Sequence, residues 1–205
     1  MGKVKLLIPF VCFIFLVACG NEKADTQKED DNTLKASVHT SIEDVSYEQA
    51  IEEADLIAEV SIKKIQGIVE GGNNIVAKTK FEGHIDKVYA GSKKDNDTIS
   101  ILQEGKDGME VEDYPVFEPG EKYILMLMDS GDKKTYWIKG QVNGTYLVED
   151  KSILKFGEKE EALPEKEDKN TIEASIKEKQ EETDGNSQIL DTKMFKKQLE
   201  SDVRK

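Results

Sequence analysis

The middle of the chain repeatedly alternates apolar and polar residues with a period of two. In "DLIAEVSIKKI", every second residue from Leu56 to Ile62 is apolar, as in a half-buried strand. "IVAKTKFEGHIDKVYAG" and "DTISILQ" repeat the alternation, and the unbroken apolar run "EKYILMLMD" indicates a strand buried on both faces, beneath a helix. With the shorter runs "TYWIKGQV", "TYLVED" and "SILKF", the pattern predicts a mainly β fold: five to six strands in a small antiparallel barrel or a strongly curled sheet.

Two local signals mark where elements begin or turn. Ser46 and Gln49 have the spacing of a capping box, so "SYEQAIEEAD" is predicted to form a helix of about two turns before the first strand. Asn143-Gly144 is the strongest hairpin signal in the chain, because a type I′ turn requires positive φ at both central residues. We therefore expect a tight reversal between the strands on either side of it.

The last residues predict a helix with one narrow apolar stripe. Asp191 occupies the N-cap position, and Leu190 and Phe195 are spaced as a hydrophobic staple. Phe195, Leu199 and Val203 recur at every fourth position. Because so narrow a stripe does not stabilise an isolated helix in water, we expect this helix to dock on the barrel. A separate partner protein is the alternative.

The first 18 residues are organised like an export signal. Lys3 and Lys5 provide a positive start, and residues 6–17 form an apolar run interrupted only by Pro9. Crossing the hydrocarbon core of a membrane requires about twenty apolar residues. The run is too short for that and has the length of a secretory signal. We therefore expect residues 1–18 to be removed.

The end of this signal reads Leu16-Val17-Ala18-Cys19, which resembles the lipobox of bacterial lipoproteins. The resemblance implies that the Cys19 thiol receives a diacylglyceryl group and that the chain is cut just before it. The alternative is a chance Ala-Cys pair after an ordinary signal. Cys12 lies within the signal, so the mature chain would have no free thiol for a disulfide, a nucleophile or a metal. Cys19 is the predicted lipidation site.

Two polar segments flank the predicted barrel. Residues 19–44 are nearly free of large apolar side chains and are predicted to be a flexible tether. Residues 158–185 contain eleven acids and five bases and are predicted to be a solvated acidic linker. Removal of residues 1–18, with two lysines and no acid, changes the net charge from −13 to −15. This charge argues against nucleic acid as a partner and leaves the lipid on Cys19 as the membrane attachment.

The sequence shows no catalytic or metal-binding constellation. Acids crowd one loop, at Glu104, Asp107, Glu110, Glu112 and Asp113. Paired carboxylates serve glycosidases, but such crowding is expected in a chain this acidic, and the EF-hand spacing is not met. His39 and His84 have no partners at ligand spacing. We therefore predict no catalytic residue, no metal site and no cofactor.

The order of these elements resembles a broad group of uncharacterised surface lipoproteins of Gram-positive bacteria. The residues that carry the resemblance are "EEADLIAEVSI", "TKFEGHIDKVYAG", "FEPGEKYILMLMD", "YWIKGQVNGTYLVED" and "LDTKMFKKQLE". It implies an OB-like β-barrel domain over residues 45–157 and a docked C-terminal helix over 186–205, on the extracytoplasmic face of the cell membrane. Gly83 departs from the group, which tends to have an apolar residue there, and is predicted to mark a bulge or a weak point.

Three classes of function remain open. The first is a non-enzymatic binding or interaction module tethered at the cell envelope, with an envelope protein or a glycan as ligand. The second is an envelope-acting hydrolase that uses the acidic loop, and the third is low-affinity cation capture by loop 104–113 or by the linker. We prefer the binding module, because the motifs HExxH and G-x-S-x-G are absent. The aromatic residues Tyr123, Tyr136, Trp137 and Tyr146 are candidates for a binding face, although we expect them in the core.

Overall fold

The structure, a computed structural model, describes residues 45–72, 75–109, 111, 114–183 and 185–205. The predicted signal, Cys19, the tether and His39 lie outside these residues. So do Glu110, Glu112 and Asp113 of the acidic loop. Within the part of the chain that is described, no helix is long and apolar enough to cross a membrane.

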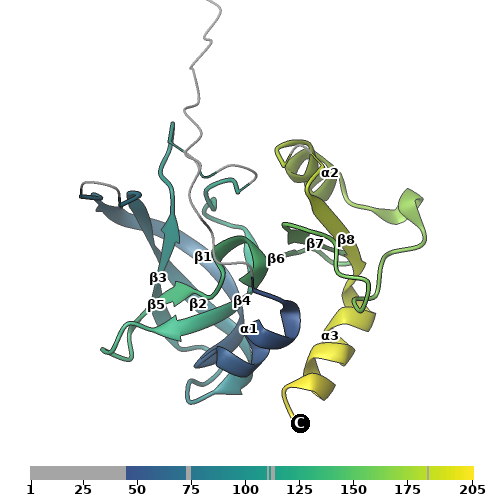
Figure 1. The fold of residues 1–205 in the computed structure, drawn as a ribbon, viewed down its shortest axis with the longest axis horizontal. Coiled ribbons are helices and arrows are strands. Elements are labelled where there is room, and N and C mark those ends of the chain that lie inside the picture. The colour runs from purple at the N-terminus through teal and green to yellow at the C-terminus, as the bar shows by residue number, and fades with distance from the viewer. Residues whose placement is uncertain (1–44, 73–74, 110, 112–113, 184) are drawn as a thin grey trace, which may run out of the picture. The chain divides into compact units, whose positions relative to one another are not determined.

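Five strands close into a barrel (Figure 1). They are β1 (Leu56–Val69), β2 (Lys78–Gly91), β3 (Thr98–Glu104), β4 (Lys122–Asp129) and β5 (Thr135–Ile138). Their order is β1-β2-β3-β5-β4, and β4 pairs back with β1 to complete the ring. Every pair is antiparallel except β3 with β5. The prediction of a mainly β fold built on a small barrel is confirmed, with one parallel pair that the sequence pattern did not indicate.

The same sheet continues beyond the barrel through β6 (Thr145–Val148), β7 (Ser152–Phe156) and β8 (Ser187–Asp191). Along one edge of β4, β5 pairs with residues 127–129 and β6 with residues 123–125. The chain therefore keeps its direction from β5 to β6, through the 3-10 turn η1 (Gln141–Gly144), instead of reversing. The hairpin predicted at Asn143-Gly144 is wrong, since the partners of β6 are β4 and β7.

Two hydrophobic cores lie on opposite faces of this sheet. The first fills the barrel, and the second lies between the outer face of the sheet and the helices α1 (Tyr47–Glu53) and α3 (Thr192–Asp202). Strand β4 contributes to both: Tyr123, Leu125 and Leu127 point into the barrel, whereas Ile124 and Met126 point toward the helices. The prediction that this strand is buried on both faces beneath a helix is therefore confirmed.

Both predicted terminal helices form, with the predicted caps. Ser46 Oγ accepts a hydrogen bond from Gln49 N (3.2 Å), and Asp191 Oδ1 accepts one from Met194 N (2.9 Å). Phe195 of α3 is fully buried and stacks on Tyr146 of β6, with ring centroids 4.9 Å apart. The prediction that the last helix docks on the barrel's sheet is confirmed.

Gly83 coincides with a bulge, as its departure from the resembled group predicted. The pairing of β1 with β2 shifts register between Ile62 and Lys64, beside Gly83. A Cβ on Gly83 would lie 2.6 Å from Val60 Cγ1 and 2.7 Å from Ile101 Cδ1. The residue is therefore small because two barrel side chains occupy the space.

Residues 158–185 do not form a solvated linker, and this prediction is wrong. Leu163 and Ile176 are buried, and Lys166 and Lys179 are only 7% and 6% exposed. The segment contains the short 3-10 turn η2 (Lys169–Thr171) and helix α2 (Ala174–Glu181), and it leads into β8, which pairs with β7. This charged segment packs on the rest of the protein through a few buried apolar side chains and through the buried methylene groups of its lysines. Residue 157 is therefore not a boundary between the barrel and a separate linker.

Candidate functional site

A cleft of about 420 Å³ opens between the outer face of the barrel and the C-terminal elements. Its walls come from β1, the start of β4, the end of β6, α2 and the first turns of α3. Leu147 and Val148 supply apolar surface. Six ionisable side chains line it: Glu59, Glu121, Lys122, Glu149, Asp150 and Lys196. The cleft is therefore a polar recess with four carboxylates and two ammonium groups.

Glu59 is the most buried charge of the cleft, with 7% of its surface exposed. It lies on the outward face of β1, and its carboxylate is 2.8 Å from Lys196 Nζ and 3.7 Å from Lys122 Nζ. The Tyr89 hydroxyl also donates to it, at 3.3 Å. Burial and the charge of Glu59 raise the pKa of Tyr89, so that hydroxyl stays a donor at neutral pH. Glu59 thus joins strand β1 to β4 and to α3.

Lys122 is shared between Glu59 and Asp86. Its Nζ lies 3.2 Å from Asp86 Oδ2, and Ser61 Oγ donates to the same carboxylate oxygen at 2.6 Å. Partial burial disfavours ionisation of Asp86, but the Ser61 hydroxyl and Lys122 outweigh it and lower the pKa of this carboxyl. Glu59, Lys122, Asp86 and Ser61 therefore form one connected polar network on the outer face of the barrel.

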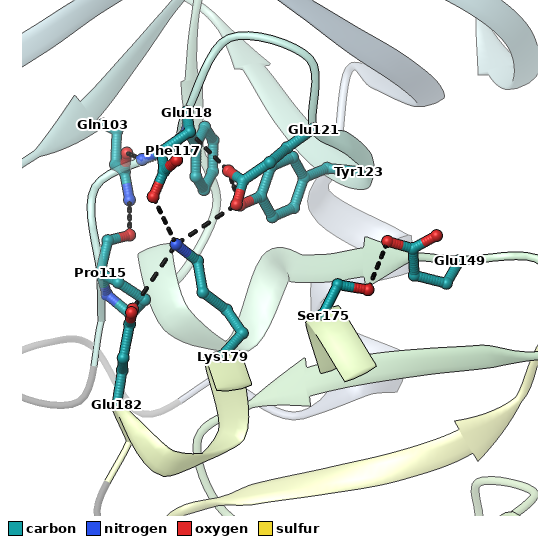
Figure 2. Close-up of polar contacts among 10 residues, drawn as sticks. All are labelled: Gln103, Pro115, Phe117, Glu118, Glu121, Tyr123, Glu149, Ser175, Lys179 and Glu182. Carbon is teal, nitrogen blue, oxygen red and sulfur yellow. Dashed lines mark hydrogen bonds and ion pairs between the residues drawn. The ribbon is translucent and has the colours of Figure 1, made fainter. Parts of the chain in front are cut away.

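Helix α2 forms another wall, and its Lys179 reaches three carboxylates (Figure 2). The amine is 3.2 Å from Glu118 and Glu121 and 3.5 Å from Glu182. Burial opposes the charge of Lys179, but Glu121, Glu182 and Glu118 outweigh it and raise the pKa of the amine. Glu121 also accepts from the Tyr123 hydroxyl at 2.6 Å. This network fixes Glu121 at the edge of the cleft.

One turn earlier on α2, Ser175 binds the opposite wall. Its Oγ donates to Glu149 Oε1 at 2.7 Å (Figure 2). The Glu149 carbonyl in turn accepts from Thr192 Oγ1 of α3 at 3.1 Å. Ser175 and Lys179 are four residues apart and thus share a face of α2. The helix is therefore attached to the cleft at two points.

Asp150 differs from the other carboxylates of the cleft. It is exposed, and within the described residues its side chain makes no hydrogen bond or ion pair, whereas Glu59, Glu121 and Glu149 each have a side-chain partner. The lining as a whole carries two more negative than positive charges. Such a recess can hold a small ligand that presents an ammonium group to Asp150 and a carboxylate to the lysines.

The residues singled out from the sequence do not converge on this cleft. Glu104 pairs with Lys78 at 3.2 Å, and neither it nor Asp107 lines the recess. Among the described residues, no group of three or more His, Cys, Asp or Glu side chains is placed to hold a metal. His84 lies half-buried on the outer face of β2. The acidic loop is therefore not assembled with other acids in the described part of the chain.

The aromatic residues divide into two sets. Tyr123, Tyr136 and Tyr146 are buried, which confirms their assignment to the core. Trp137 is 45% exposed on β5, so its assignment to the core is wrong. The alternation of β5 explains this, because Tyr136 and Ile138 point into the barrel and Trp137 points out.

Sequence reasoning missed the cleft residues because each resembles an ordinary exposed charge. Glu59 occupies a polar position of an alternating strand, and Lys196 lies on the polar side of an amphipathic helix. The two meet only because α3 packs across β1. No local signal in the sequence reports that packing.

The fold and the cleft define a class: a small closed β-barrel whose sheet extends into a helix-flanked layer, with a polar recess at the junction. Compared with known protein families and with curated proteins, the chain matches no family and no curated sequence.

Proposed function

We propose that this protein is a lipid-anchored binding module on the extracytoplasmic face of the cell membrane. The export signal and the Leu16-Val17-Ala18-Cys19 run support acylation of Cys19. The mature charge of −15 supports the lipid, and not the net charge of the protein, as the primary attachment to the membrane. The protein is then a tethered domain that binds an envelope component without transforming it.

The cleft at the junction of barrel and helices is the binding site in this proposal. Its main support is the position of Glu59, a buried carboxylate held between Lys122 of β4 and Lys196 of α3. A recess lined by charges of both signs selects a ligand whose own positive and negative groups are arranged to match them. The ligand class is a zwitterionic group, such as an amino- and carboxyl-bearing part of an envelope protein or glycan.

Fractionation of cells tests the anchor. Full-length wild type and Cys19→Ala are expressed in a Gram-positive host and partitioned with detergent after labelling with a radioactive fatty acid. We expect the label and the detergent-phase partitioning to be lost in Cys19→Ala and retained in Cys12→Ala, the matched control. Label retained by Cys19→Ala would overturn the lipoprotein assignment.

Thermal shift tests the cleft. Free glycine is the zwitterionic probe, and methylamine and acetate are the single-charge controls. We expect the melting temperature of the wild type to rise with glycine concentration, because a ligand that binds only the folded state stabilises it. Lys196→Gln and Asp150→Asn should weaken the rise at least several-fold, whereas Lys193→Gln, exposed on α3 and outside the lining, should keep it. No response of the wild type, or an equal response in all variants, would contradict a zwitterion site.

A further inference from the structure

The β1–β2 hairpin carries an exposed apolar surface at the end where it projects beyond the barrel. The ladder between β1 and β4 ends at Ser61, and Ile62 still exchanges backbone hydrogen bonds with Gly120 and Glu121. Beyond Ile62, β1 continues to Val69 with β2 alone. The apolar tip is defined by four side chains, Ile65, Ile68, Val69 and Ile75, which are 50%, 43%, 48% and 62% exposed. They are four of the seven large apolar residues exposed in the described part of the chain. Such a concentration marks an interaction surface.

The tip is far from the cleft in the fold. Figure 1 shows this end of the hairpin on the side of the barrel away from β6–β8, α2 and α3. Residues 70–77, between the two strands, contain one charged residue, Glu70, which pairs with Lys106 at 3.0 Å. The surface is therefore separate from the proposed ligand site.

Lysines flank the tip in a chain that is otherwise strongly acidic. Residues 62–82 contain four lysines and two acids, a local charge of +2 against −13 for the whole chain. Lys64 pairs with Glu82 (3.1 Å) and Lys78 with Glu104 (3.2 Å). Lys63 and Lys80 make no ion pair within the described residues. The two unpaired lysines, Lys63 and Lys80, are thus the charges beside the apolar tip that can meet an anionic surface.

A second copy of this chain is a poor occupant. The edge of β1 beyond Ile62 is unpaired within the described residues, so it is a possible site for strand addition. Lys63 and Lys64 lie on that edge, where their charges oppose the addition of another strand. Lysine on an edge strand is a common device against this kind of pairing.

We propose that the apolar tip contacts an anionic lipid bilayer. The four aliphatic side chains enter the interfacial region, and the flanking lysines keep their ammonium groups at the headgroups. This inference rests on the proposed anchor in one respect: the lipid on Cys19 keeps a bilayer within reach. The second contact would hold the domain on the membrane in one orientation.

A fluorescent label tests this contact in the acylated full-length protein. Cys19 is blocked by lipid and Cys12 is lost with the signal, so Ile75→Cys supplies a single free thiol for an environment-sensitive dye. The protein is reconstituted in vesicles of phosphatidylglycerol and phosphatidylcholine, or of phosphatidylcholine alone. Met194→Cys, equally exposed at 60% on α3, is the matched control.

At position 75, we expect a blue shift and quenching by lipids spin-labelled in their acyl chains, stronger in the anionic vesicles, and neither effect at position 194. Lys63→Gln combined with Lys80→Gln should reduce the quenching at least twofold. An aqueous spectrum at position 75 in both vesicles would overturn the contact. Energy transfer between labelled copies without lipid quenching would assign the tip to a second copy instead. A protein that does not enter vesicles and whose measured mass includes no acyl group would refute the lipid anchor. This result is distinct from an aqueous spectrum at position 75 and from energy transfer between copies.

Discussion

Gly83 shows how one missing side chain shapes the barrel. Its position points inward on β2, where Val60 and Ile101 already fill the space. The register of β1 shifts at the same level. The β1–β2 ladder shifts register at three other levels as well, so what the missing side chain provides here is room for Val60 and Ile101 in the barrel interior.

Gly83→Ala should lower the free energy of unfolding by about 1–3 kcal/mol, because the added methyl group overpacks the interior. Urea denaturation followed by far-UV circular dichroism measures the change. Gly72→Ala is the control, since a Cβ there meets nothing within 4 Å. Equal midpoints for the two variants would show that the barrel accommodates a side chain at Gly83.

Asp132 organises the exposed turn between β4 and β5. Its carboxylate accepts hydrogen bonds from Thr135 N (2.6 Å) and Lys134 N (2.7 Å), and these bonds lower the pKa of Asp132 from 3.8 to about 2. The lowered pKa means that the stabilisation by the ionised form is complete above pH 3.8 and is lost as the pH falls toward 2. Carboxyl titration by nuclear magnetic resonance should give a midpoint near 2. A midpoint near 3.8 would exclude these bonds in solution.

At the scale of elements, the sequence predicted best what local chemistry determines. The cap of Ser46, the N-cap of Asp191 and the unbroken run of β4 each correspond to an observed element. The Asn143-Gly144 hairpin failed because strand partners are chosen by the whole sheet: β5 and β6 lie end to end along β4. A turn propensity acts within four residues and does not report that arrangement.

The docked helix α3 offers a direct measure of the outer core. Phe195→Ala should cost about 3–5 kcal/mol of stability, because the ring is fully buried against Tyr146 and Tyr47. Met194→Ala, on the exposed side of the same turn, should stay within about 0.5 kcal/mol. Thermal unfolding of both variants distinguishes the two expectations. An unchanged melting temperature for Phe195→Ala would mean that α3 does not contribute to the stability of the barrel.

For the whole molecule, composition was the misleading signal. The acidic segment 158–185 has the charge content of a solvated linker, yet Leu163 and Ile176 anchor it and Lys179 pairs with carboxylates of the barrel. The cleft was equally hidden, because its walls come from elements far apart in the chain. Non-local packing decides both features, and neither periodicity nor charge content encodes it.

Removal of residues 158–205 should therefore abolish cooperative unfolding of the remaining barrel. The truncation uncovers the edge of β7 and the outer core, including Ile124 and Tyr146. Calorimetry of the truncated chain should show no sharp transition. Deletion of Arg204 and Lys205, both exposed, is the control and should leave the transition intact. A cooperative transition in the long truncation would restore residue 157 as a domain boundary.

The contact between the first and last helices also affects when the chain can fold. Tyr47 of α1 packs against Phe195, and its hydroxyl donates to Asp202, 155 residues further along (3.2 Å). Contacts so distant in sequence form late and slow folding. For the export that we propose, the outer core can therefore form only after the C-terminus has left the translocation channel. On that proposal, we expect the chain to cross the membrane without a stable fold and to complete its structure after release of its last helix.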